Sequence, residues 1–301
     1  MEMRESGNMK AWVLDSIGNI QLKEMEKPAP ADREVLVRVR NCGICGSDIP
    51  RIYRDGAHRM PLVIGHEFAG EVEECGKGVS KEWEGKRVGI FPLIPCKQCG
   101  PCKKGLFEMC RSYGYLGSRR DGGFAQYVTV PAWNLIELPE NVSFLQAAML
   151  EPMAVAMHAI GRIEPKPKDR TAVYGQGTIG LFLLMLLLER GIPDIFVFAN
   201  HDVQIKTAME FGLPKENICD TRTENIGDWI LKRTDGAGFD ASFDAIGSSV
   251  IYSVTVEHSA PGGRICLMGN PASDMGLKRD IYWKILRNQL VLCGTWNSSF
   301  A

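Results

Sequence analysis

Apolar and polar residues follow two different patterns along the chain, and the change between them lies near residue 150. In the first half, short stretches of alternating or continuous apolar residues are separated by glycines, which is typical of β-strands. The strands that this pattern predicts span 35–40, 68–73, 87–91 and 124–130. We therefore expect a β-rich domain at the start of the chain.

The second half alternates short apolar runs with longer stretches of helical periodicity. It predicts strands at 171–174, 195–199, 239–245, 264–268 and 289–294, and helices at 178–190, 202–211, 226–233, 249–258 and 281–287. Such alternation is typical of a doubly wound parallel sheet, so the predicted fold class is α/β. We place the boundary so that the domains span 1–155 and 156–301.

Composition narrows the class of protein. The chain has 301 residues, a length that favours two domains, and its 35 Lys and Arg against 36 Asp and Glu exclude a dedicated nucleic-acid binder. The longest apolar run, 179–188, has about half the roughly 20 residues that a membrane span needs. The first residues lack the apolar segment of a secretory signal. We expect a cytoplasmic protein with no membrane segment, whose ten cysteines serve metal binding or core packing.

Four closely spaced cysteines form the clearest motif. Cys96, Cys99, Cys102 and Cys110 follow the pattern C-x2-C-x2-C-x7-C. Four thiolates surround one tetrahedral Zn²⁺ and leave no position open, so the motif predicts a structural zinc. The motif does not fit an iron–sulfur cluster, because the usual spacing before the fourth cysteine and the proline after it are missing. Free surface thiols, the other alternative, would be easily oxidised.

Cys45, His66 and Glu151 make a second candidate metal site of a different kind. Three protein ligands leave the fourth zinc position to water or substrate, as in catalytic sites. Taken singly, each residue also has an ordinary structural explanation, as a small buried thiol, a core histidine and a carboxylate that caps a helix. Glycines and polar residues beside Cys45 and His66 favour the metal. Cys42 and Cys45 also form C-x-x-C, but without the strand–helix–strand context of a redox pair.

A glycine-rich loop follows the predicted strand 171–174 and opens an apolar helix. In a G-x-G-x-x-G loop the glycines permit a tight turn, the approach of a pyrophosphate and close packing of helix on strand. The helix amides then hold the phosphates. The residues expected to bind a dinucleotide here are Gly175, Gly177, Thr178, Ile179 and Gly180.

Asn200 stands where such a loop usually has an acidic partner, about twenty positions further on. An amide hydrogen-bonds ribose hydroxyls, but it does not repel a 2′-phosphate. No arginine stands beside Asn200 in the sequence to pair with such a phosphate. We therefore expect NAD, with NADP as the alternative; His201 or Lys206 would then supply the cation.

The motifs GICGSD, GHEFAG, PCKQCGPC and GSRRDGGFAQY, together with the glycine-rich loop, resemble the zinc-containing medium-chain dehydrogenase/reductase family, and within it the polyol dehydrogenases. The resemblance covers Met9 to the last residue. It implies a GroES-like catalytic domain, a Rossmann domain and two zinc ions per chain. It also implies NAD-linked oxidation of a secondary alcohol on a small polyol or polyol phosphate, by a homodimer or homotetramer.

The resemblance also implies roles for single residues. The catalytic zinc would be held by Cys45, His66 and Glu151. Glu67 would lie beside it as an occasional or indirect ligand, and Asp48 would accept the hydrogen bond that orients His66. Ser47 would pass on the substrate proton. Pro50 stands where alcohol dehydrogenases commonly have the next histidine of the relay, so the proton must leave by another route.

Arg119 and Arg120 lie in a glycine-flanked loop, where two guanidinium groups suit a substrate phosphate. Further positive charge stands just beyond the Cys45 segment, on Arg51, Arg54 and His58. Ordinary surface arginines paired with Asp121 and Asp55 are the alternative. Two other functions remain open: an unphosphorylated polyol such as sorbitol or xylitol as substrate, or zinc and nucleotide binding without turnover.

The chain ends at Ala301, just after the last predicted strand, whereas members of the family continue back into the catalytic domain. We therefore expect this returning segment to be missing and part of the catalytic core to be uncovered. Contiguous exposed apolar surface favours association, so the isolated chain is expected to be unstable or to aggregate.

Overall fold

The computed structural model of the protein describes residues 7–299 and divides into two compact units. The division falls between Glu151 and Pro152, in the first turn of helix α4 (Leu150–Ile163), and Ser299 belongs with the first unit.

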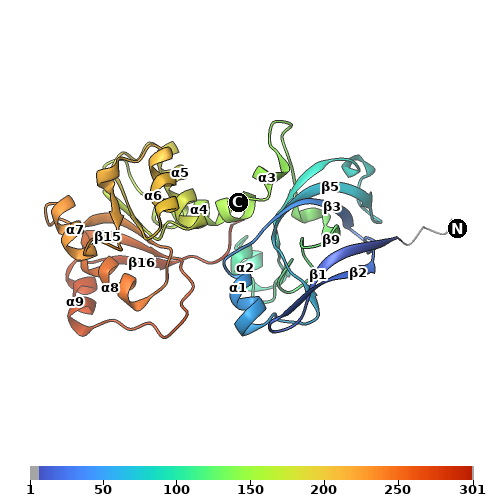
Figure 1. Ribbon diagram of the computed structural model, residues 1–301, viewed down its shortest axis with the longest axis horizontal. Helices are drawn as coiled ribbons and strands as arrows, with labels where there is room; N and C mark the ends of the chain where they lie inside the picture. The colour runs from blue at the N-terminus through green and yellow to red at the C-terminus, as the bar shows by residue number, and fades with distance from the viewer. Residues whose placement is uncertain (1–6, 300–301) are drawn as a thin grey trace. The chain divides into compact units, whose positions relative to one another are not determined.

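The first unit consists mainly of antiparallel sheets, in strand orders β10-β6-β5-β3-β9, β2-β1-β4 and β7-β8 (Figure 1). All four strands predicted here are present, as β3, β5, β6 and β9, whereas the β1–β2 hairpin was not predicted. The strands are β1 (Asn8–Ser16), β2 (Asn19–Glu26), β3 (Glu34–Gly43), β4 (Leu62–Val63), β5 (Glu67–Cys75), β6 (Arg87–Ile90), β7 (Leu93–Ile94), β8 (Gly114–Tyr115), β9 (Tyr127–Pro131) and β10 (Leu135–Glu137). Short helices join them: α1 (Asp48–Pro50), η1 (Arg51–Asp55), η2 (Lys81–Trp83), α2 (Gly100–Lys103), η3 (Phe107–Met109), η4 (Ala132–Asn134) and α3 (Phe144–Ala147).

The core of the first unit explains why these segments are strands. Val35 and Val37 of β3, Val72 of β5, Val88 of β6 and Val130 of β9 pack together and are buried. Branched side chains of this kind fit a pleated, half-buried surface.

The second unit is a six-stranded parallel sheet in the order β13-β12-β11-β14-β15-β16. This order places the first strand at the centre and reverses direction there, as in dinucleotide-binding sheets, so the predicted α/β class is confirmed. The strands are β11 (Thr171–Tyr174), β12 (Ile195–Ala199), β13 (Ile218–Asp220), β14 (Phe239–Asp244), β15 (Ser259–Leu267) and β16 (Val291–Gly294). The helices are α5 (Thr178–Glu189), α6 (Asp202–Glu210), η5 (Lys215–Asn217), α7 (Ile226–Arg233), α8 (Ser249–Glu257) and α9 (Arg279–Arg287).

Helices cover both faces of this sheet. Val173 and Val197 belong to a core with α4, α5 and α6, whereas Tyr174 and Phe198 pack with α7 and α8. Figure 1 shows the two helix groups on opposite sides of the strands. Because both faces are covered, β11 and β12 are buried along their whole length and appear in the sequence as continuous apolar runs.

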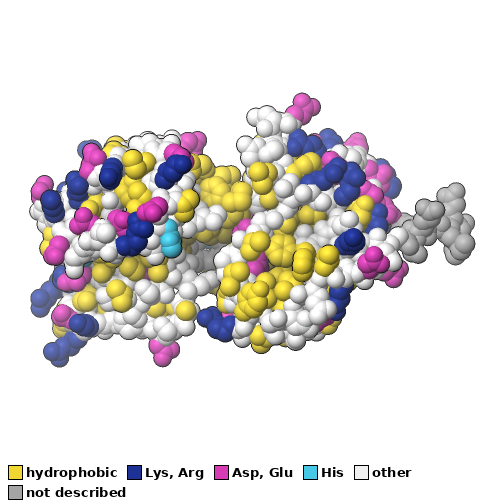
Figure 2. Space-filling view, viewed as in Figure 1, with side chains coloured by type: hydrophobic (Ala, Val, Ile, Leu, Met, Phe, Trp, Pro, Cys, Tyr) yellow, Lys and Arg dark blue, Asp and Glu magenta, His cyan; other side chains and the backbone are white. Residues whose placement is uncertain are grey.

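Charges of both signs are mixed on the surface. Figure 2 shows Lys and Arg side chains interspersed with Asp and Glu over the visible face of the second unit. That face therefore presents no field of a single sign, in keeping with the net charge of −1. Within residues 7–299, no helix has the length and apolar character needed to cross a membrane.

Candidate active site and metal centres

The pairing of β3 with β5 positions the first candidate site. The strand register sets Gly43 opposite Glu67, which brings the loop after β3, with Cys45, beside His66 and Glu67. A Cβ at position 43 would overlap the Glu67 carboxylate, so any larger residue would push that carboxylate from its present position.

Cys45, His66 and Glu67 form a compact donor group. One ligand atom from each lies within 4.8 Å of the other two, and His66 and Glu67 are buried. The backbone N–H and the hydroxyl of Ser47 both point at the Cys45 sulfur, at 3.5 and 3.3 Å. A thiol, an imidazole and a carboxylate in one place are the donor types of a catalytic zinc site.

Glu151 lies nearby but outside that group. Its Oε1 accepts a hydrogen bond from the Tyr115 hydroxyl at 2.9 Å, and the Tyr115 ring lies 5.8 Å from the His66 ring, centroid to centroid. Glu67, expected as an indirect ligand, thus lies in the compact group, whereas Glu151, expected as a ligand, lies outside it; the ligand role of Glu151 stays a prediction. The reason is tertiary: β5 carries Glu67 directly into the site, while Tyr115 of β8 binds the Glu151 carboxylate.

Asp48 is fully buried and supports the Cys45 loop. Its Oδ2 accepts a hydrogen bond from the Cys45 backbone N–H at 3.0 Å, and its Oδ1 binds the Arg51 guanidinium. The expected hydrogen bond from His66 is not formed, because Nδ1 lies 3.6 Å from Oδ1 and has no hydrogen-bond partner within the described residues. Arg51 takes that oxygen instead. The sequence signal that was overlooked is the spacing of three between Asp48 and Arg51 at a helix start.

The electrostatics of the group fit a divalent cation. Burial raises the pKa of Cys45 to about 11, raises that of Glu67 and raises that of Glu151 to about 7. Burial, aided by the positive charge of Arg51, lowers the pKa of His66 to about 4, which keeps the imidazole neutral. A metal ion at this point would stabilise the thiolate and carboxylate forms and needs a neutral imidazole, so these residues fit zinc.

The four cysteines predicted to hold a structural zinc are also brought together. The sulfur atoms of Cys96 and Cys102 lie 3.9 Å apart, and those of Cys99 and Cys110 lie 4.0 Å apart. With Zn–S bonds of about 2.3 Å, the edge of a regular ZnS₄ tetrahedron is about 3.8 Å. Backbone N–H groups of Cys96 and Cys99 point at the sulfurs of Cys110 and Cys96, which favours thiolates. The cluster therefore fits a closed zinc site.

The glycine-rich loop of the second unit is built as expected for a phosphate site. Gly175 ends β11 with a φ of +91°, and a side chain at Gly180 would collide with the Gly175 carbonyl. Gly177 caps α5 and is exposed, as is Thr178, while the side chain of Ile179 packs into the core. The first amides of α5, which have no partner inside a helix, are therefore open to an anion.

Asn200 follows β12 directly and is exposed, and its backbone N–H donates to the Gln204 side chain at 3.0 Å. No arginine stands beside Asn200 in the sequence, but the structure brings one to the following helix start. Arg222, just after β13, forms an ion pair with Asp202 at 2.6 Å. Parallel pairing of β12 and β13 brings together residues that are twenty apart in the sequence.

The two arginines predicted to bind a phosphate have different partners in the structure. Arg120 forms an ion pair with Glu34 at 2.7 Å. The guanidinium of Arg119 lies over the Tyr113 ring, 4.6 Å from its centroid. Arg54 binds its neighbour Asp55, so it is also occupied.

Two family models match the chain: "Alcohol dehydrogenase GroES-like domain" over residues 31–140 and "Zinc-binding dehydrogenase" over residues 178–300. Galactitol 1-phosphate 5-dehydrogenase of Escherichia coli K12 is 31% identical over 294 residues, which cover 96% of this chain and 83% of that protein. The chain belongs to the zinc-binding alcohol dehydrogenase family.

Solved structures of this zinc-type dehydrogenase family share the fold. An alcohol dehydrogenase (rspB) of Escherichia coli CFT073, complexed with NADH, matches with a TM-score of 0.90 and 31% identity, over 97% of this chain and 85% of that one. A zinc-binding dehydrogenase of Sinorhizobium meliloti, bound to NADP, matches with a TM-score of 0.91 and 27% identity, over 98% and 86%. The family resemblance, the GroES-like plus Rossmann fold and the enzyme class predicted from the sequence are confirmed.

Two glycine variants of this dehydrogenase separate folding from phosphate binding. Gly180→Ala should lower stability by about 1–3 kcal/mol, because its methyl group collides with the backbone. Gly177→Ala has room and an ordinary φ of −72°, so stability should change little, but its methyl should weaken dinucleotide binding about tenfold or more. Thermal unfolding and NADH titration measure the two effects. Unchanged NADH affinity in Gly177→Ala would argue against this loop as the phosphate site.

Proposed function

We propose that the protein is a zinc- and NAD-dependent dehydrogenase that oxidises a secondary hydroxyl of a polyol phosphate, with galactitol 1-phosphate converted to tagatose 6-phosphate. The donor group of Cys45, His66 and Glu67 carries the proposal, because three ligands leave one zinc position for the substrate oxygen. The relative named for galactitol 1-phosphate supports the choice of polyol. A second zinc would be held by the four-cysteine cluster.

When bound, zinc and NAD would supply the acidity of the substrate hydroxyl and the acceptor for its hydride. The residues of this chain would do the rest. Ser47, whose hydroxyl lies 3.3 Å from the Cys45 sulfur, would take the proton that the substrate hydroxyl loses. Asp48 and Arg51 hold the Cys45 loop in position through the Cys45 N–H. Tyr115 fixes Glu151 beside the metal ligands.

The surroundings of Arg119 support a phosphorylated substrate. The Tyr113 ring beneath its guanidinium lies 6.2 Å from the Tyr115 ring, which in turn lies 5.8 Å from the His66 ring. A chain of ring contacts thus connects Arg119 with a proposed metal ligand. The Nε atom of Arg119 is buried and has no hydrogen-bond partner among the described residues.

The two arginines near His58 differ in their partners: Arg51 is paired with Asp48, whereas the Arg119 guanidinium lies over the uncharged Tyr113 ring. Burial, aided by the charges of Arg119 and Arg51, lowers the pKa of His58, so its imidazole is neutral at neutral pH. An anionic group of the substrate would therefore meet the charge of Arg119. Arg120, by contrast, already has its carboxylate partner in Glu34, so we assign phosphate recognition to Arg119 alone.

Arg119→Ala should lower kcat/KM for galactitol 1-phosphate by roughly tenfold to a hundredfold, the cost of losing one hydrogen bond to a charged group. The value for unphosphorylated galactitol should stay nearly unchanged. Arg120→Ala is the matched control, because its ion pair with Glu34 places it outside this role. Steady-state kinetics on both polyols measure the selectivity.

Equal kcat/KM for the two polyols, or an equal loss on both in Arg119→Ala, would favour the second candidate, a dehydrogenase of an unphosphorylated polyol such as sorbitol or xylitol. A protein that binds two zinc ions and a dinucleotide but reduces no NAD with any polyol would be a binding protein without turnover. The open donor set argues against that third alternative.

A further inference from the structure

The carboxyl ends of β12 and β13 lie side by side at the edge of the sheet where such folds bind their ligands. Ala199 pairs with Asp220, and the Thr221 N–H donates to the Ala199 carbonyl at 2.9 Å. The residues that follow each strand, 200–202 and 220–222, therefore meet. The end of the second strand in such a sheet is where the adenosine ribose lies.

Arg222 is held there between two carboxylates. Its Nε and Nη2 bind Oδ1 and Oδ2 of Asp220 at 2.9 and 2.7 Å, and Nη2 also binds Oδ1 of Asp202 at 2.6 Å. These hydrogen bonds lower the pKa of Asp220 to about 2, so it is ionised at neutral pH. Together the three side chains carry a net charge of about −1.

We propose that Asp202, Arg222 and Asp220 act as a charge clamp that makes the protein select NAD(H) over NADP(H). The inference rests on the dinucleotide site of the proposed function. It adds the residues that would distinguish a 2′-hydroxyl from a 2′-phosphate on the adenosine ribose. Solved relatives hold NADH in one case and NADP in another, so the fold alone leaves the choice open. Asn200 stands in place of the usual acidic residue, and the clamp supplies the negative charge that the amide lacks.

A 2′-phosphate would bring a further charge of about −1.5 to −2. Arg222 is the cation placed to meet it, but its Nε and Nη2 already bind two carboxylates. Turning the guanidinium toward the phosphate would leave Asp202 and Asp220 unpaired beside it. The 2′-hydroxyl of NAD meets no such repulsion, because a carboxylate accepts a hydrogen bond from it.

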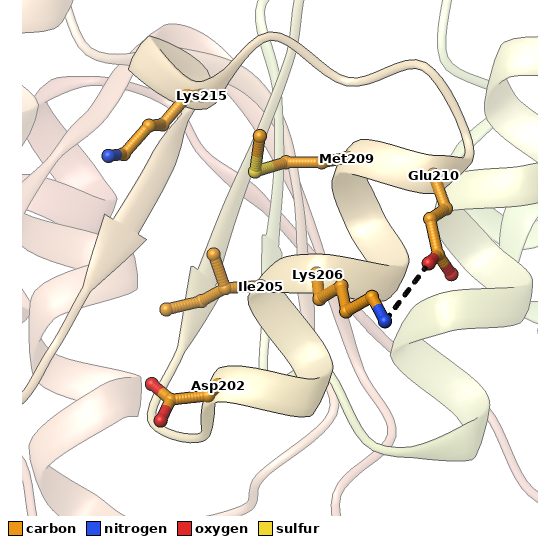
Figure 3. A pocket seen from close by; sticks show the side chains of 6 residues that line it. All are labelled: Asp202, Ile205, Lys206, Met209, Glu210 and Lys215. Atoms are coloured by element: carbon orange, nitrogen blue, oxygen red, sulfur yellow. Dashed lines mark ion pairs between the residues drawn. The ribbon is translucent and has the colours of Figure 1, made fainter.

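Two lysines on neighbouring elements are poorly placed to pair with a 2′-phosphate. Figure 3 shows Lys206 directed toward Glu210, to which it is paired at 3.7 Å, whereas Asp202 points to another side of α6. Lys215 lines the groove beside α6, but it belongs to η5, which precedes β13. It therefore lies toward the beginning of that strand, away from Asp220.

The test titrates NADH and NADPH into the zinc-loaded full chain and follows nicotinamide fluorescence. The wild type should bind NADH at least about a hundredfold more tightly, as expected for unpaired like charges of more than one unit. Asp202→Ala removes one of the two carboxylates bound to Nη2 of Arg222 and one negative charge, so NADPH affinity should rise about tenfold or more. NADH affinity should change much less.

Glu210→Ala is the matched control, because it removes an acidic residue from the same helix but outside the clamp, and it should leave the NADH to NADPH ratio unchanged. Arg222→Ala should weaken NADPH further. Equal affinity for both dinucleotides in the wild type, or an unchanged ratio in a folded Asp202→Ala, would overturn the clamp alone. If neither dinucleotide bound the wild type, the proposed function would fail and the clamp with it.

Discussion

Cys45→Ser should abolish turnover while the protein keeps its fold and one of its two zinc ions. The Cys45 sulfur belongs to the compact donor group with His66 and Glu67, and without it the site retains one nitrogen and one carboxylate ligand. Loss of the metal removes a contribution of several kcal/mol to the transition state, so kcat/KM should fall by about 10³-fold or more. Zinc analysis and initial rates of NADH formation measure both effects.

Cys42→Ser is the control for this variant. Cys42 is half-buried, as Cys45 is, and lies three residues before it, but its sulfur points to the Gly43 carbonyl and is not part of the donor group. It should keep both zinc ions and most of the activity. Two zinc ions in Cys45→Ser, or unchanged turnover, would contradict the assignment, and a strong loss in Cys42→Ser would favour a redox pair.

Cys102→Ser should lower the stability of the protein more than its catalytic rate. Cys102 is buried, and the segment around the cluster contains only the short elements α2 and η3. Turn hydrogen bonds and the packing of Phe107 on Trp133 also support this segment, but a metal would join all four cysteines, and structural zinc contributes directly to folding free energy. We expect the free energy of unfolding to fall by several kcal/mol and the zinc content by one ion per chain.

Cys75→Ser is the matched control for stability. Cys75 is a buried thiol of β5 outside both groups, where its sulfur donates to the Ser80 carbonyl at 3.4 Å. Its replacement should cost only about 1 kcal/mol and leave the zinc content unchanged. If Cys102→Ser were as stable as Cys75→Ser and kept all its zinc, the cluster would not be a structural metal site.

The strength of the apolar pattern decided which elements could be predicted. Strands β11 and β12 are buried on both faces and form unbroken apolar runs, so the sequence located them closely. The β1–β2 hairpin was not predicted, because β2 is mostly polar and partly exposed, with the sequence NIQLKEME. Strand β13 has three residues, too few for any periodicity.

The candidate site shows the same limit at the level of side chains. Glycine and polar neighbours identified Cys45 and His66, and close spacing identified the four cysteines between Cys96 and Cys110. Ion pairs such as Arg120 with Glu34, which are 86 residues apart, depend on how the strands pair. The same holds for the bond between Tyr115 and Glu151, 36 residues apart, which separates Glu151 from the donor group.

Hydride transfer from a labelled substrate tests the central claim most directly. Galactitol 1-phosphate with deuterium on carbon 5 is incubated with NAD and the zinc-loaded protein, and the dinucleotide is analysed by mass spectrometry. We predict NADH that carries the deuterium, formed more slowly than from unlabelled substrate, and slower again by about 10³-fold or more with Cys45→Ser. Failure of the wild type, with both zinc ions bound, to form NADH from galactitol 1-phosphate or any other polyol would contradict the account.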